Sequence, residues 1–255
     1  IGFVGIGAPG SINPITGIIG FSNNLGFANT PIVKMLEERL NKKVIIDNDA
    51  NAAAVGEMLA GAGAGCNNIV AVTLGTGVGG GTIIDGKMLL GTNFAGGELG
   101  HTVIVFNGEQ CTCGRRGCWE AYASATALVK QTKAKMLENK DSKMWEIVNG
   151  DIEKVNGKTA FDAMRLNDKA GIEVVDQYCD YVACGVVNFI NVFQPTVVCI
   201  GGGISKEGDV LISRINKHLD ERFSKNIDKQ SIVKTAVLGN DAGIIGAAML
   251  DKIYN

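Results

Sequence analysis

The sequence lacks the features that mark membrane proteins, disulfide-bonded secreted proteins and nucleic-acid-binding proteins. No apolar run is long enough to span a bilayer. The formal net charge is only -2, so no excess of basic residues favours nucleic acid or an anionic membrane. The seven cysteines are an odd number, which fits a reducing cytoplasm better than a disulfide framework. We therefore expect a cytoplasmic globular protein without a membrane or nucleic-acid partner.

Two familiar nucleotide-binding motifs are missing as well. The sequence has no P-loop lysine motif. Residues 75–80 nearly match the dinucleotide-binding glycine pattern, but a hairpin, not a helix, is expected to follow them. Glycine is nevertheless abundant, with 35 residues in short clusters. Glycine turns at 75–81, 201–203 and 241–243 would let phosphates approach the backbone, although an ordinary tight turn also explains each one.

Apolar strands alternate with helical segments along the chain, and one strand pair forms a hairpin across Asp85-Gly86. This pattern predicts α/β layers around a mixed sheet. Residues 11–29, rich in Asn, Gly and Ser, are predicted to form a surface loop. A helix is predicted from Thr30, as its N-cap, to Asn41. The other predicted strands cover 1–6, 44–46, 69–74, 80–84, 87–90, 197–200 and 232–237, and the other helices cover 50–59, 120–138, 159–166, 168–193, 207–224 and 244–253.

Residues 97–120 hold the densest group of chemically active side chains. His101 is followed by Cys111, Cys113 and Cys118, and three thiolates with one imidazole are a tetrahedral zinc set. Four protein ligands would close the coordination sphere, so the zinc would be structural. The alternative is three ordinary buried cysteines and a core histidine. Two glutamates flank the ligands, and a rigid metal knot would suit residues that grip a polar ligand.

Asp49 is the best candidate for acid–base chemistry. It lies where a strand is predicted to end and a helix to begin, beside Asn48 and Asn51. A carboxylate there could accept a proton from an alcohol while the helix N-terminus stabilises its charge. The competing interpretation is a simple N-cap aspartate. Asp47 is a weaker candidate because it is still on the strand side.

Six runs along the chain carry a resemblance to a known family. They are DNDANAAA at 47–54, LGTGVGGG at 74–81, GELGH at 97–101, CTCGRRGCWE at 111–120, GGGIS at 201–205 and GNDAGIIGAA at 239–248. Taken together, these runs resemble the ROK family of sugar kinases and sugar-responsive repressors, which belongs to the actin-like ATPase superfamily. The resemblance covers essentially the whole chain, and within the family the bacterial ATP-dependent glucokinases are most similar.

The resemblance implies phosphorylation of a hexose by ATP with Mg²⁺, most simply of glucose to glucose 6-phosphate. His101 would bind zinc through one ring nitrogen and the sugar through the other. The implied roles are catalytic base for Asp49, sugar binding for Asn48, Glu98, His101 and Glu120, phosphate or nucleotide binding for Thr76, Gly77, Gly202 and Gly203, and zinc binding for His101, Cys111, Cys113 and Cys118.

The family also implies a two-lobed, actin-like (ribonuclease H-like) fold and a homodimer. The small lobe would hold residues 1–46 and 244–255, and the large lobe residues 47–243. Family kinases begin with a hairpin that carries an Asp-Gly-Gly-Thr motif for ATP and magnesium, and this sequence does not contain one. If the chain is a fragment, little or no kinase activity is expected from it alone.

Two other functions stay open from the sequence. The first is a kinase for another hexose, such as N-acetylmannosamine, fructose or allose. The second, from a different class, is the sugar-sensing domain of a ROK repressor. The aspartate and the glycine turns favour the kinase, because a sensor needs neither a base nor a phosphate clamp.

Overall fold

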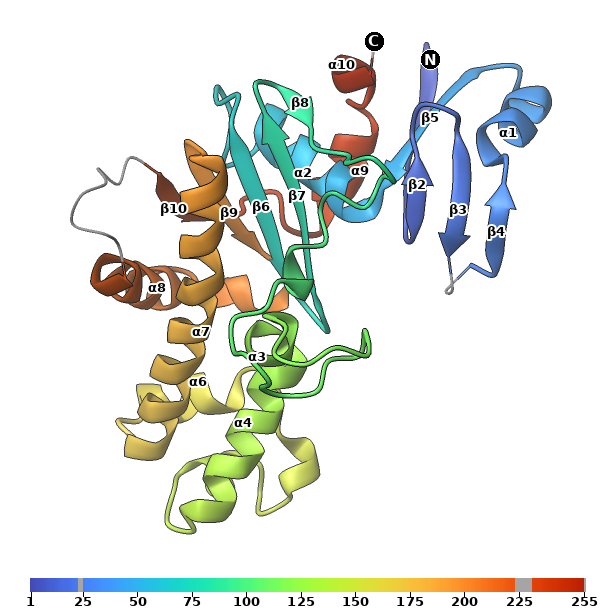
Figure 1. The fold of residues 1–255 in the computed structure, drawn as a ribbon. Helices are drawn as coiled ribbons and strands as arrows, with labels where there is room; N and C mark the ends of the chain where they lie inside the picture. The colour runs from blue at the N-terminus through green and yellow to red at the C-terminus, as the bar shows by residue number, and fades with distance from the viewer. Residues whose placement is uncertain (23–24, 223–230, 255) are drawn as a thin grey trace.

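The centre of the molecule is a five-stranded mixed sheet in the order β10-β9-β6-β7-β8, which confirms the predicted class (Figure 1). The computed structural model describes residues 1–22, 25–222 and 231–254. Strand β6 pairs in parallel with β9, whereas β7 runs antiparallel to it. The strands are β6 (Ile69–Leu74), β7 (Val78–Ile84), β8 (Lys87–Met88), β9 (Val197–Gly201) and β10 (Ile232–Thr235).

Strand β6 contributes to two separate hydrophobic cores because its side chains alternate between the two faces of the sheet. Val70, Val72 and Leu74 belong to the larger core, which includes residues of the helices α4 (Ala125–Glu138), α7 (Lys169–Phe193) and α8 (Asp209–Arg222). Ile69 and Ala71 belong to a smaller core with residues of helix α2 (Asp49–Ala60). Both faces of the sheet are therefore covered, and two of the glycine turns follow the ends of the strands β6 and β9.

The predicted hairpin is confirmed. Asp85 and Gly86, between β7 and β8, have φ angles of 51° and 73°. Positive φ at both central residues is what a two-residue type I′ turn requires, and Asp-Gly is a preferred sequence for it.

The predicted surface loop over 11–29 is wrong for most of its length. A three-stranded antiparallel sheet stands there, and the Thr30 N-cap is also wrong because Thr30 ends the last strand. Ile12 and Ile19 are buried between short polar turns, which is enough to fix a small sheet. These strands are β2 (Ser11–Asn13), β3 (Ile18–Ser22) and β4 (Phe27–Thr30), followed by α1 (Ile32–Leu40), and beside them β1 (Phe3–Ala8) pairs in parallel with β5 (Lys43–Asn48).

Two predicted helices are each broken into two. Ser124 interrupts the helix over 120–138, because its extended backbone and its side-chain bond to the Ala127 N–H start a new helix. The closing helix is likewise divided, and the end predicted for the 207–224 helix lies partly outside the described residues. The helices are α2 (Asp49–Ala60), α3 (Glu120–Ala123), α4 (Ala125–Glu138), α5 (Met144–Ile147), α6 (Thr159–Arg165), α7 (Lys169–Phe193), α8 (Asp209–Arg222), α9 (Ala242–Ala247) and α10 (Asp251–Tyr254).

Helices α2 and α9 pack with their backbones close together. A Cβ atom on Gly246 would collide with the Ala52 carbonyl, and one on Gly56 would collide with the Ala242 carbonyl. Only glycine permits this approach. The close packing joins the C-terminal segment directly to the helix that begins at Asp49.

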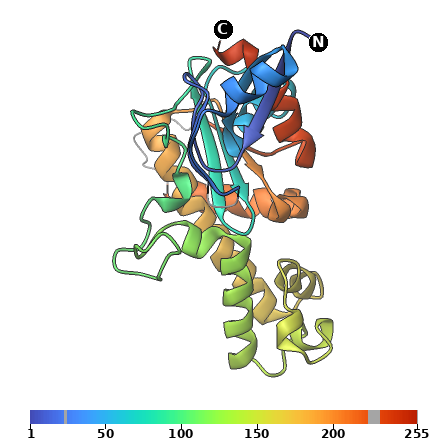
Figure 2. The same ribbon diagram turned by 90° about the vertical axis from the view of Figure 1, so that its right-hand side faces the viewer.

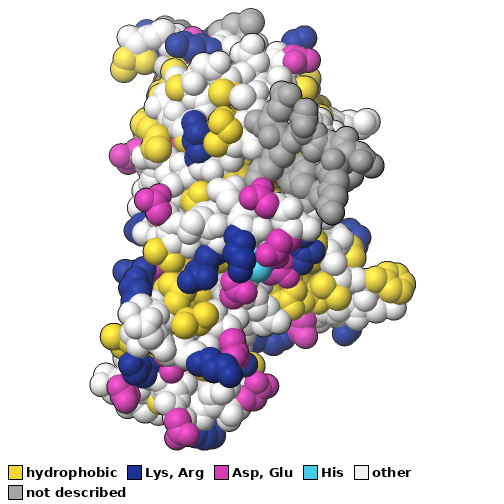
Figure 3. Space-filling model, turned by 90° about the vertical axis from the view of Figure 1, so that its left-hand side faces the viewer, with side chains coloured by type: hydrophobic (Ala, Val, Ile, Leu, Met, Phe, Trp, Pro, Cys, Tyr) yellow, Lys and Arg dark blue, Asp and Glu magenta, His cyan; other side chains and the backbone are white. Residues whose placement is uncertain are grey.

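Helices α7 and α8 are joined by ion pairs on the face shown in Figure 3, where acidic and basic side chains surround one histidine. Arg222 contacts Asp180 at 2.6 Å, and His218 lies 3.3 Å from Asp176. Figure 2 shows α4 and the segment after it extending from the body of the molecule. In the described ranges no helix is long and apolar enough to cross a membrane.

Candidate functional site

The junction between β5 and α2 exposes the predicted base. Asn48 has an extended backbone, and its Oδ1 accepts hydrogen bonds from the N–H groups of Ala50 at 2.9 Å and Asn51 at 3.4 Å. Asn48 is therefore the N-cap, and Asp49 is the first residue of the helix. The Asp49 side chain is exposed and accepts a hydrogen bond from the adjacent Ala50 N–H. Because Asn48 caps the helix, the carboxylate of Asp49 is available to other partners.

A cavity of about 410 Å³ brings together three of the predicted site residues, Asn48, Asp49 and Glu98. The 9–11 turn also lines this cavity, and the Gly10 carbonyl accepts a hydrogen bond from the Asn48 side chain at 3.1 Å. The sequence reading missed this turn as part of the site. The Pro-Gly pair directly after the first buried strand was the available signal.

The four predicted metal ligands are also brought together. The ligand atoms of His101, Cys111, Cys113 and Cys118 all lie within 4.8 Å of one another. Cys111 Sγ is 3.7 Å from His101 Nδ1, and Cys113 Sγ is 3.7 Å from Cys118 Sγ. Ligands about 2.0–2.3 Å from one tetrahedral ion lie roughly 3.5–3.8 Å apart, so the donor set and its spacing suit Zn²⁺.

Tight turns bring the last cysteine back to the others. Gly117 has a φ of 80°, and a Cβ atom there would collide with the Val105 carbonyl. Two isolated bridges, Val103 to Cys118 and Gln110 to Arg116, hold the loop in place of longer strands. This segment therefore has little regular structure of its own.

The surroundings of Cys113 and Cys118 shift the pKa values of their thiols in opposite directions. The backbone N–H of Arg115 lowers the pKa of Cys113, whereas burial raises the pKa of Cys118 to about 12. A cation among the sulfur atoms would favour the thiolate of Cys118, since metal binding displaces the thiol proton.

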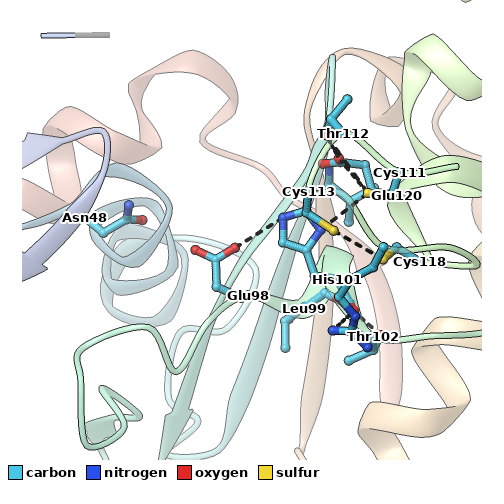
Figure 4. A network of polar contacts seen from close by, with 12 residues as sticks. Asn48, Glu98, Leu99, His101, Thr102, Cys111, Thr112, Cys113, Cys118 and Glu120 are labelled. Carbon is cyan, nitrogen blue, oxygen red and sulfur yellow. Dashed lines mark hydrogen bonds and ion pairs between the residues drawn. The ribbon is translucent and has the colours of Figure 1, made fainter. Parts of the chain in front are cut away.

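His101 lies between the cysteine ligands and Glu98, which lines the cavity (Figure 4). Its Nδ1 faces Cys111, while its Nε2 lies 3.8 Å from a carboxylate oxygen of Glu98. The two ring nitrogens thus face two different groups, which is the geometry that a shared role requires.

Glu120 forms hydrogen bonds to two different segments, which the sequence did not indicate. Its Oε2 accepts a hydrogen bond from the Val78 N–H at 3.0 Å, and its Oε1 accepts one from the Thr112 hydroxyl at 3.0 Å. It lies on the far side of His101 from Asn48 in Figure 4. Glu120 therefore ties the cysteine loop to the glycine turn at 75–77.

The three predicted glycine turns lie in two separate parts of the structure. Gly202 lines a cavity of about 630 Å³ together with residues 239–243, so two of the three predicted turns share one cavity. Thr76 and Gly77 stand beside α3 and α4, where the Thr76 carbonyl accepts from the Thr126 hydroxyl at 2.8 Å. Gly203 has open space around it.

Asp49 also lines a neighbouring cavity of about 570 Å³, with Asn240 and Gly243 on its other side. The same two residues line the cavity that contains Gly202. Asp49 therefore stands between the cavity at Glu98 and the glycine turns near the C-terminus. A carboxylate in this position could serve a reaction between ligands bound on its two sides.

The sequence reading also missed Glu57, a buried carboxylate near the end of α2. It accepts hydrogen bonds from the N–H groups of Ala62, Val237 and Leu238. It thereby fixes the loop that precedes residues 239–243. No local spacing signals this role, because Val237 is 180 residues away.

The family relationship follows from comparison with known proteins. The model of the ROK family matches residues 1–253. Glucokinase from Thermotoga maritima is 41% identical over 251 residues, covering 98% of this chain and 79% of that protein. A xylose repressor from Bacillus subtilis is 31% identical over 253 residues, covering 98% of this chain and 61% of the repressor.

A solved structure gives the same result. The ROK family glucokinase from Streptomyces griseus, in complex with glucose and AMPPNP, superposes with a TM-score of 0.85 at 33% identity. The alignment covers 98% of this chain and 81% of that one. The fold, the clustered His–Cys set and the family match over nearly every residue lead to one conclusion: this chain belongs to the ROK family.

Proposed function

We propose that this protein is an ATP-dependent hexokinase that converts glucose to glucose 6-phosphate. The observation that carries this proposal is the position of Asp49, which lines both the cavity at Glu98 and the cavity at Gly243. The similar glucokinases from Thermotoga maritima and Streptomyces griseus support glucose as the sugar and ATP as the donor.

In this proposal Asp49 accepts the proton of the sugar 6-hydroxyl as that oxygen attacks the γ-phosphorus. The new O–P bond forms while the bond from phosphorus to the ADP oxygen breaks, and the proton stays on Asp49. The N-terminus of α2 stabilises the carboxylate that must receive it. Mg²⁺ that enters with the nucleotide would neutralise charge on its phosphates.

Sugar binding is assigned to Asn48, Glu98, His101 and Glu120. Carboxylates and amides can each bind neighbouring hydroxyls in a fixed geometry, which an apolar pocket cannot do. Each carboxylate oxygen has two acceptor sites, so Glu120 can hold Val78 and still take a hydroxyl. The phosphates are assigned to Thr76, Gly77, Gly202 and Gly203.

The metal proposal is that His101, Cys111, Cys113 and Cys118 hold a structural Zn²⁺. Four protein ligands leave no open position, so the ion would take no part in the phosphoryl transfer. Its contribution would be to fix the ring of His101 with Nε2 toward Glu98.

We place residues 1–46 and 244–255 in a small lobe and residues 47–243 in a large lobe, with the sugar bound between them. Closure of the lobes would exclude water that could otherwise hydrolyse ATP. A cytoplasmic homodimer is part of the same proposal. Its surface would include the end of α7, where Val192 is 69% exposed.

A sugar-sensing role is the second candidate, and the similarity to the xylose repressor favours it. The two functions separate in one experiment on the whole protein, with ATP, magnesium and a panel of hexoses and xylose. Formation of ADP that depends on glucose supports the kinase, and a preference for another hexose would reassign the substrate. Sugar binding by calorimetry with no ADP formed would instead indicate the sensor.

A further inference from the structure

The strand that delivers Asn48 and Asp49 ends in a buried carboxylate. Asp47 is fully buried, although it lies two residues from an exposed catalytic candidate. Burial raises the pKa of its carboxyl group. A buried carboxylate is costly unless hydrogen bonds satisfy it, so its partners identify what the fold is using it for.

Three donors converge on Asp47. Its Oδ1 accepts from the Asn48 N–H at 2.7 Å and from the Asn51 side-chain amide at 3.0 Å. Its Oδ2 accepts from the hydroxyl of Tyr254 at 2.5 Å. Two of the donors belong to the strand-to-helix junction itself, and the third comes from the last helix, 207 residues along the chain.

Tyr254 is well placed to hold this carboxylate. Its ring packs at the edge of the smaller core, which includes Ile45 on the same strand. Burial also raises the pKa of its hydroxyl, so the phenol keeps its proton and donates it. The neighbouring helix α9 is held against α2 by the glycine contacts described above.

We infer that Tyr254 is a positioning residue for the reaction, acting through Asp47 on the Asn48–Asp49 junction. The inference rests on the proposed function, since it assigns Asp49 a reaction to be positioned for. Oδ1 of Asp47 holds both the Asn48 backbone and the Asn51 amide, while Oδ2 is held by Tyr254. Asn48 and Asn51 both line the cavity that contains Asp49, so a shift of Asp47 would move that wall.

The test compares Tyr254→Phe with Tyr178→Phe in the full-length protein. Tyr178 is fully buried in the larger core, and its hydroxyl donates to the Ala123 carbonyl at 2.8 Å. Each change removes one hydroxyl and keeps the ring. We expect Tyr254→Phe to lower kcat about ten-fold while the KM for ATP stays within about two-fold, because a small misplacement of a catalytic group is costly. Tyr178→Phe should lower the melting temperature without that loss of kcat.

A double variant and a measurement independent of activity complete the test. Asp47→Asn combined with Tyr254→Phe should cost no more than the worse single change, because the two residues act as one unit. Amide hydrogen exchange over residues 47–51 should accelerate in Tyr254→Phe and not in Tyr178→Phe. If the unaltered protein forms no ADP with any sugar, the proposed kinase function fails, and the exchange result still decides the positioning role. An active enzyme whose kcat and exchange are unchanged by Tyr254→Phe would overturn the inference alone.

Discussion

The two walls of the cavity are built in different ways. On one side, Asn48 and Asp49 are fixed by a buried strand, a capped helix and fully buried side chains such as Val55. On the other side, Glu98 lines the cavity with His101 behind it, in residues 97–120, where Phe106 is 87% exposed and regular structure is short. The first wall is maintained by backbone hydrogen bonds and apolar burial. The second is held by hydrogen bonds of short turns, by two isolated bridges and by the burial of Leu99 and Trp119, and a metal cross-link would add rigidity that long strands do not supply there.

The largest effect is expected when the Asp49 carboxylate on the first wall is neutralised without a change in its size. Asp49→Asn should lower kcat by about 10³-fold, because general-base catalysis is lost, and leave glucose affinity within about two-fold. Isothermal titration and a coupled ADP assay measure the two effects. Asp209→Asn is the matched control, because Asp209 is also an exposed first residue of a helix. Unchanged turnover in Asp49→Asn would exclude Asp49 as the general base.

The second wall should fail as a unit when one ligand is removed. Cys113→Ser should release zinc and lower the melting temperature by roughly 5–10 °C, because metal binding there is part of the folding free energy. Amide exchange should accelerate across 97–120 and stay unchanged across 47–60. Cys184→Ser, at a half-buried cysteine outside the cluster, controls for the loss of a thiol. Metal analysis that finds no zinc in the unaltered protein would end the metal proposal.

A milder change in the second wall should affect binding more than turnover. Glu98→Gln should raise the KM for glucose about ten-fold, because a charge-assisted hydrogen bond to a hydroxyl is lost. The effect on kcat should be smaller than that of Asp49→Asn. Glu109→Gln serves as control, because Glu109 is exposed in the same segment and its charge pairs with Lys130. Equal KM values for the two variants would contradict a role for Glu98 in the sugar site.

The smallest expected effect concerns the buried charge behind the first wall. Burial raises the folded-state pKa of Asp47, so its contribution to stability is fully present below the unfolded pKa and is lost as pH rises through the folded pKa. Asp47→Asn, which cannot ionise, should remove this dependence. Unfolding by urea at a series of pH values upward from the unfolded-state pKa of about 3.9 would show the wild type losing stability relative to the variant. The exposed Asp85→Asn should leave the slope unchanged.

The clustering of the four His and Cys side chains and the strand-to-helix junction at Asp49 could be predicted from the sequence because both are local. Sequence spacing is enough to recognise four candidate ligands within 18 residues and an aspartate between a strand and a helix. The sheet formed by β2, β3 and β4 was missed because its strands are only 3, 5 and 4 residues long, and small-sheet pairing depends on burial of single residues such as Ile12. Tyr254 is 207 residues from Asp47, and Val237 is 180 residues from Glu57, and no local pattern encodes such contacts.

The carboxylate of Glu120 couples the cysteine loop to the glycine turn that follows β6. It binds the cysteine loop through Thr112 and the glycine turn through the Val78 N–H, so the conformations of these two segments are not independent. Under the proposed assignments, metal binding at the loop would favour the turn conformation that receives phosphate. Linkage is reciprocal, so nucleotide binding would then raise the zinc affinity by the same factor as zinc raises the nucleotide affinity.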